Sequence, residues 1–94
     1  MGHPPLNHPA VEQITITVKL FAIYQEAYGQ PELQWTFPAH TPIEEVLNRV
    51  LVEHPHLEPW RERTRLGLNL QFVSPDTLLE DGDEVVLIPP VSGG

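Results

Sequence analysis

The chain has 94 residues, with 13 acidic and 5 basic side chains, a formal net charge of -8 at pH 7, and no cysteine. This length suits one small domain, and the missing cysteines exclude disulfides, a thiolate nucleophile and a cysteine-ligated metal or iron–sulfur cluster. The charge opposes binding to nucleic acid, and no membrane-length apolar run or signal segment is present, so we expect a cytoplasmic protein without membrane partners.

Residues 1–12 are rich in proline and lack apolar periodicity, which predicts a disordered N-terminal extension. From Gln13 the residues alternate strictly, which predicts a half-buried strand with one face formed by Ile14, Ile16, Val18 and Leu20. Residues 22–28 predict a short helical turn stopped by Gly29, and the alternation over residues 33–37 predicts a second strand that Pro38 ends.

The clearest helix start is Thr41-Pro42-Ile43-Glu44, which predicts Thr41 as N-cap, Pro42 as first helical residue and Glu44 as partner in a capping box. Pro55 ends this helix. Its apolar stripe has the spacing that covers a sheet and consists of Ile43, Val46, Leu47, Val50 and Leu51.

The remaining segments are short. Residues 57–65 predict a second short helix or a loop over the sheet edge, with Trp60 at its centre. Residues 66–73 predict one strand or two strands around a turn. Residues 80–83 form a turn, and residues 84–88 predict a β-branched closing strand.

This order of elements predicts an α+β fold over residues 13–88, a ubiquitin-like β-grasp. Its mixed sheet has one main helix and short accessory helices, and its first and last strands lie side by side in the middle. We expect core roles for Phe21, Leu68 and Leu87, with interface docking as the alternative for these three. We expect core and edge cover for Trp35 and Trp60, and a solvated turn for the acidic residues 80–84.

Two groups of side chains, the histidines and a cluster of arginines, are considered for metal binding and for partner docking. His3 and His8 lie in the extension, and His54 and His56 flank a helix-ending proline without zinc-type spacing, so we expect no metal site. The basic patch beside Trp60, formed by Arg61, Arg63 and Arg65, is interpreted first as a solvated face and second as a partner-docking surface.

The closing strand runs into an extended tail, residues 89–94, called the strap below: Pro89-Pro90-Val91-Ser92-Gly93-Gly94. The prolines favour extended geometry and are expected to hold the strap away from its own domain. Glycine has no Cβ, so Gly93 and Gly94 let another protein close around the chain. The reactive group predicted here is the carboxylate of Gly94.

The chain resembles the ubiquitin-like MoaD/ThiS family, the small sulfur-carrier subunits of molybdopterin synthase, over about residues 13–94. The specific feature is the combination of the acidic turn, the apolar closing strand and Pro-Pro-Val-Ser-Gly-Gly at the terminus. The other motifs that carry the resemblance are Leu20-Phe21-Ala22, Thr41 with Glu44, Leu68-Asn69 and Leu79-x-Asp81-Gly82-Asp83-Glu84-Val85.

The resemblance implies that a separate adenylating enzyme consumes ATP to join Gly94 to AMP, and that a sulfur donor then leaves a terminal thiocarboxylate. The chain itself would bind no cofactor and act as a non-catalytic sulfur donor. Its large partner subunit would hold the catalytic groups and a tunnel for Pro89, Pro90, Val91, Ser92 and Gly93, and sulfur would pass to a pyranopterin precursor of the molybdenum cofactor.

Two alternatives remain open at this stage. One is a sulfur carrier for thiamine thiazole or another pathway. The other is a non-catalytic β-grasp modifier or binding module, whose tail is inert or forms an isopeptide bond with lysine.

Overall fold

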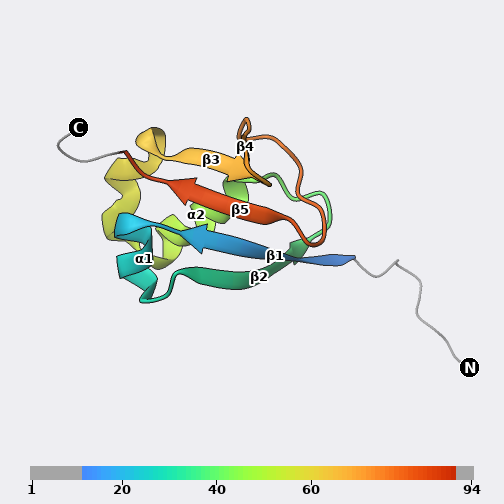
Figure 1. Ribbon diagram of the computed structural model, residues 1–94, viewed down its shortest axis with the longest axis horizontal. Helices are drawn as coiled ribbons and strands as arrows, with labels where there is room; N and C mark the ends of the chain where they lie inside the picture. The colour runs from blue at the N-terminus through green and yellow to red at the C-terminus, as the bar shows by residue number, and fades with distance from the viewer. Residues whose placement is uncertain (1–11, 91–94) are drawn as a thin grey trace, which may run out of the picture.

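The computed structural model describes residues 12–90 and contains one five-stranded mixed sheet with the strand order β2-β1-β5-β3-β4 (Figure 1). The strands are β1 (Gln13–Leu20), β2 (Glu32–Pro38), β3 (Arg65–Leu68), β4 (Gln71–Phe72) and β5 (Glu84–Ile88). The first and last strands, β1 and β5, pair in parallel, and the other neighbours are antiparallel. The predicted β-grasp is therefore confirmed.

The helices are α1 (Ala22–Tyr28), α2 (Glu44–Glu53) and the 3-10 helix η1 (Pro55–Arg63). The stripe of α2 is buried as predicted and packs with the inward side chains of β1 and β5 into one core. Trp35 belongs to this core, and Trp60 is half-buried against it. Among residues 12–90, no helix is long and apolar enough to cross a membrane.

The start of α2 differs from the prediction. Ile43, not Thr41, is the N-cap, and no side chain caps the helix. The hydroxyl of Thr41 instead donates to the carbonyl of Pro38. The N–H groups of Ile43 and Glu44 donate to the carbonyls of Thr77 and Pro75, at 2.7 and 3.0 Å. A remote loop thus satisfies the donors that a capping box would have satisfied.

The acidic turn before β5 is exposed, as predicted, but two of its carboxylates have structural partners. Asp81 accepts a hydrogen bond from the N–H of Thr15 at 2.8 Å, and Asp83 accepts one from the N–H of Glu80 at 2.7 Å. The N–H of Gly82 donates to the carbonyl of Thr15. These contacts tie the turn to β1 and fix where β5 begins.

A second polar cluster joins α1 and α2 beside β2. The hydroxyl of Tyr28 donates to Glu53 at 2.6 Å, and Arg49 pairs with Glu53 at 3.3 Å while its guanidinium lies 4.0 Å from the ring centroid of Trp35. The hydrogen bond from Tyr28, followed by that from Arg49, lowers the pKa of Glu53. Burial and the nearby Glu53 raise the pKa of Tyr28.

Two valines on α2 give a matched test of the core. Val50 is fully buried, with 0% of its surface exposed, whereas Val52 is 78% exposed. We expect Val50→Ala to lower the free energy of unfolding by about 2 kcal/mol, because it leaves a cavity. Val52→Ala should change it by less than about 0.5 kcal/mol. Urea unfolding of both variants checks this, and equal effects would contradict the packing described.

The lowered pKa of Glu53 predicts a pH dependence. A carboxyl group whose pKa is lower in the folded state stabilises the fold above its ordinary pKa of 4.5, and this stabilisation is lost as the pH falls through the folded value. Glu53→Gln should therefore weaken the loss of stability below pH 4.5. Melting temperatures from pH 7 to 3 measure this, with the exposed α1 residue changed in Glu26→Gln as control. An equal fall in melting temperature below pH 4.5 in both variants would refute the prediction.

Candidate functional site

The site is the outer face of the sheet at the end of β5, where the strap begins. Side chains of β5 alternate between buried and half-buried, so Val85 and Leu87 point into the core while Val86 and Ile88 face outward. Leu87 lies beside Leu20 of β1 on one side and Leu66 of β3 on the other. The outward side chains at this end therefore stand between the ends of β1 and the β3–β4 hairpin.

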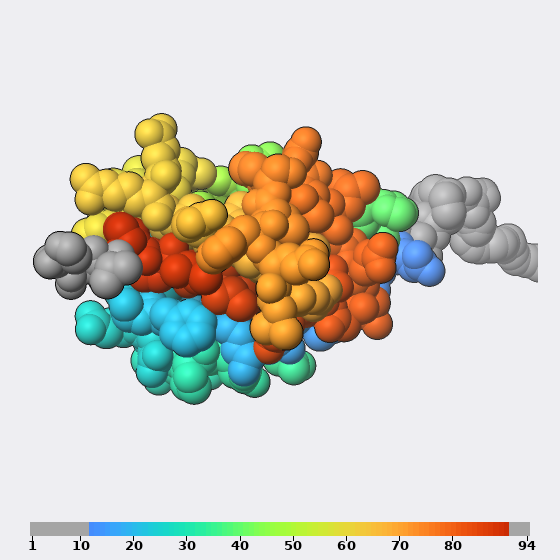
Figure 2. Space-filling view, turned by 45° about the horizontal axis from the view of Figure 1, so that its top comes forward, coloured from blue at the N-terminus to red at the C-terminus, as the bar shows by residue number. Residues whose placement is uncertain are grey.

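Two adjoining hollows on this face share Phe21 and Ile88, and we call them together the apolar groove. Figure 2 shows β5, in red, at the surface between the blue end of β1 and the orange β3–β4 hairpin. The groove is lined by Phe21, Ala22, Ile23, Trp60, Gly67, Leu70, Gln71, Phe72, Val86, Ile88, Pro89 and Pro90.

Phe21 was expected in the core, and this prediction is wrong, because the side chain is 50% exposed. Side chains alternate along β1, so the buried Leu20 places the next residue on the opposite face. Ala22 then adopts a left-handed conformation with φ 49°, where the chain enters α1. Of the other two residues expected in the core, Leu87 is fully buried and Leu68 is half-buried against the core.

Charged side chains on the outer face include Lys19 of β1 and Arg65 of β3. Farther back along β1, Lys19 contacts Glu32 at 2.9 Å and Glu84 at 3.7 Å, and its hydrogen bond with Glu32 raises its pKa. At the hairpin, the guanidinium of Arg65 lies 4.0 Å from the ring centroid of Phe72. The groove itself is lined by no acidic or basic side chain, so it favours an apolar partner surface.

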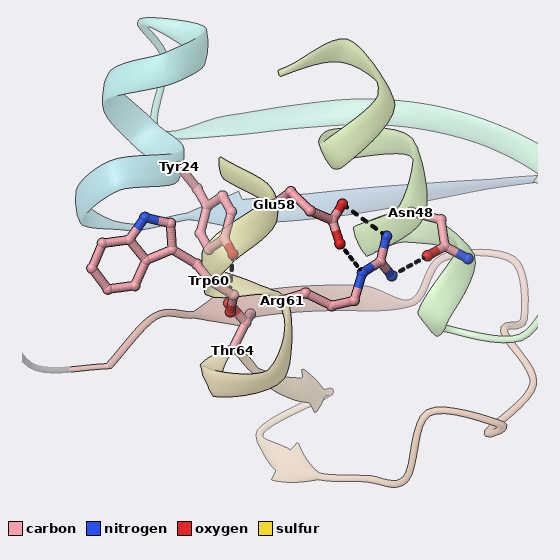
Figure 3. A network of polar contacts seen from close by, with 6 residues as sticks. All are labelled: Tyr24, Asn48, Glu58, Trp60, Arg61 and Thr64. Carbon is pink, nitrogen blue, oxygen red and sulfur yellow. Dashed lines mark hydrogen bonds and ion pairs between the residues drawn. The ribbon is translucent and has the colours of Figure 1, made fainter. Parts of the chain in front are cut away.

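A hydrogen-bond network holds Trp60 at the groove wall (Figure 3). Thr64 donates its only hydroxyl proton to the carbonyl of Trp60 at 2.9 Å, so the buried Tyr24 must be the donor in its 2.5 Å bond with Thr64. This chain of two bonds fastens the end of η1 to α1.

Arg61 fastens η1 to the main helix. It contacts Glu58 at 2.7 Å and Asn48 of α2 at 2.6 Å, and the hydrogen bond from Arg61 lowers the pKa of Glu58. The side chain of Arg61 is nevertheless 40% exposed, in keeping with the solvated face expected for the basic patch. Arg63 and Arg65 lie over aromatic rings, those of Trp60 and Phe72.

The predicted strap residues are only partly described. Pro89 and Pro90 are half-buried and line the groove with Phe21 and Trp60, so the strap starts along the domain surface and not free of it. Val91, Ser92, Gly93 and Gly94 lie outside the described residues. Sequence reasoning missed Phe72 and Leu70 as groove residues. The pairing of β3 with β4 brings both to this face.

Chemically, the groove offers a binding surface and no reaction centre. Its lining within residues 12–90 has no acid, base or nucleophile pair, and no group of three or more His, Asp or Glu side chains in that range is placed to hold a metal ion.

Comparison with known proteins gives consistent findings. The sequence model of the ThiS family matches residues 18–94. A molybdopterin synthase sulfur carrier subunit of Arabidopsis thaliana is 32% identical over 86% of this chain and 84% of its own length.

Two solved structures are also similar. The small archaeal modifier protein 1 of Methanosarcina acetivorans is 30% identical with a TM-score of 0.68, over 88% of this chain and 99% of its own. A chain from the complex of subunits 1 and 2 of the molybdopterin-converting factor of Helicobacter pylori is 28% identical with a TM-score of 0.55, over 86% of this chain and 100% of its own.

The Tyr24–Thr64 bond can be tested by a double-mutant cycle. Thr64→Val leaves the hydroxyl of the fully buried Tyr24 without its partner, and we expect it to lower the free energy of unfolding by about 1–3 kcal/mol. Adding Tyr24→Phe removes the stranded hydroxyl, so the double variant should be more stable than the sum of the single losses by about 1 kcal/mol. Strict additivity in urea unfolding would contradict the bond.

Proposed function

The chain belongs to the ThiS family, and from this membership we propose that it is the sulfur-carrier subunit of a molybdopterin synthase, with Gly94 as the sulfur-bearing residue. The observation that carries the proposal is the position of the strap. It continues the central strand β5, starts beside an apolar groove, and ends in Gly93-Gly94. A terminus of this kind suits delivery into the active site of another protein.

The chemistry begins with activation, because a carboxylate is a poor acyl donor. An activating enzyme joins the carboxylate of Gly94 to the α-phosphate of ATP and releases pyrophosphate. A sulfur nucleophile then displaces AMP, which leaves a terminal thiocarboxylate. The absence of cysteine from the chain leaves the terminus as the place for transferable sulfur.

The thiocarboxylate is anionic near neutral pH and acts as a sulfur nucleophile toward the pyranopterin precursor. The C–S bond to Gly94 is then cleaved by water, which regenerates the carboxylate. Acid–base groups for this step belong to the large subunit, since the groove of this chain provides none. The related Helicobacter pylori chain, which is part of a two-subunit complex, supports a partner of this kind.

A second candidate function is protein modification. It is favoured by the similarity to the small archaeal modifier protein 1, which has comparable identity and a higher TM-score than the Helicobacter pylori chain. A modifier also activates its terminal glycine, but it ends in an isopeptide bond with lysine. The two functions therefore differ in the product that accumulates.

The deciding experiment is the intact mass of the chain after incubation with the activating enzyme, ATP and a sulfur donor. We expect a gain equal to one oxygen replaced by one sulfur, localised to Gly94 and absent from a variant that lacks Gly94. The thiolated chain should then convert the pyranopterin precursor only when the large subunit is present. Covalent ladders on other proteins, without thiolation, would assign the chain to the modifiers.

A further inference from the structure

The tip of the β3–β4 hairpin has an unfavourable backbone conformation at an exposed leucine. Leu68 pairs with Gln71, so the loop consists of Asn69 and Leu70 alone. Both residues have positive φ, 49° and 74°, which is the pattern of a type I′ turn. Such turns favour Asn-Gly, because glycine adopts positive φ without strain. Asn69 fits this preference, whereas Leu70 stands where glycine is favoured.

The strain is not offset by packing within the domain. Leu70 is 91% exposed, the highest value among the large apolar side chains of the described residues that lie on the surface. Left-handed backbone at a residue other than glycine, asparagine or aspartate costs of order 1 kcal/mol and persists where the surrounding structure enforces it. At a strained and exposed position, glycine or asparagine would stabilise the fold better than leucine does.

The surrounding structure enforces the turn through Asn69. Its side chain donates to Asp83 at 2.9 Å and accepts a hydrogen bond from the N–H of Glu84 at 2.9 Å. Its own N–H donates to the carbonyl of Glu84 at 2.9 Å. The hairpin tip is thereby fixed to the start of β5, and the backbone that carries Leu70 is already ordered before any partner arrives. Preordering of this kind lowers the entropic cost of binding.

Leu70 also lies in the right place for docking. It lines the apolar groove with Phe21, Phe72 and Ile88, and the other end of the same groove is formed by Pro89 and Pro90, from which the strap leads to Gly94. A protein that encloses the strap must lie against this groove. Leu70 extends the apolar surface available to that protein beyond the edge of the sheet.

We propose that Leu70 is a preformed anchor residue for the large synthase subunit, inserted into an apolar pocket of that subunit when the strap enters its active site. This inference rests on the proposed function, because it names the partner that the function requires. It predicts that loss of the leucine side chain weakens the affinity without lowering the stability.

The test uses Leu70→Gly and Leu70→Asn in the full chain, with the large molybdopterin synthase subunit of the same organism as probe. Both replacements suit positive φ, so the melting temperature should stay the same or rise by a few degrees. The Kd measured by calorimetry should increase at least about tenfold, as for an anchor residue. The matched control is Leu78→Asn, a 51% exposed leucine at the opposite end of β1, which should leave the Kd unchanged.

Each other outcome counts against the inference. Unchanged affinity of both Leu70 variants, with a wild-type chain that binds and transfers sulfur, would overturn the anchor role and leave the proposed function standing. A fall in melting temperature would show that Leu70 serves the fold. A dimer of the chain alone that Leu70→Asn disperses would assign the residue to a second copy. A wild-type chain that does not bind the large subunit would overturn both proposals.

Discussion

The parallel pairing of β1 with β5 is the contact on which the rest of the structure depends. It joins residues 17–20 to residues 84–87, so nearly the whole domain lies between the two paired segments. The inward side chains at this pairing, Val18, Leu20, Val85 and Leu87, are at most 1% exposed. Closing so long a loop is entropically unfavourable, and burial of these side chains against α2 provides the opposing free energy. The α2 helix packs on this pairing from one side, and β3 of the hairpin pairs with β5 beside it.

The same pairing creates the functional surface. Parallel strands end at the same edge, and the register Leu20–Leu87 therefore places Phe21 and Ile88 close together on the outer face. In both strands, alternate side chains therefore point into the core, and the side chains between them point to the outer face that carries the groove. Pro89 and Pro90 follow β5 directly, so the start of the strap is fixed by a central strand of the sheet. The core thereby fixes the positions of Pro89 and Pro90 relative to the groove.

Much of the fold could be predicted because the signals are local. The alternation from Ile14 to Leu20 and the helical spacing from Ile43 to Leu51 identify the strand and the helix that form the core. Phe21 was also predictable in principle, because a buried Leu20 in a strand implies an outward next residue. The apolar side chain of Phe21 favours burial, but its place in the alternation decides which face it occupies.

The errors share a different cause, which is partners remote in the sequence. Thr41 has the sequence of an N-cap, but the carbonyls of Pro75 and Thr77 satisfy the helix instead. Asp81 and Asp83 lie in a turn that was predicted correctly, but their hydrogen bonds to Thr15 and Asn69 could not be predicted from the local sequence. The local sequence does not predict positive φ at Leu70 either. The turn is imposed by the pairing of β3 with β4 and by the contacts of Asn69.

The position of the groove constrains how the proposed carrier would work. Its function requires Gly94 to visit an activating enzyme and then the large synthase subunit, and each must enclose the strap. Because Pro89 and Pro90 form one wall of the groove, a protein that encloses the strap also covers Phe21 and Trp60. Under the proposed function the two enzymes would compete for one surface, and the chain would have to leave the first before it bound the second. The groove is apolar and its described lining has no charged side chain, so no desolvated ion pair would slow dissociation of the chain from the first enzyme.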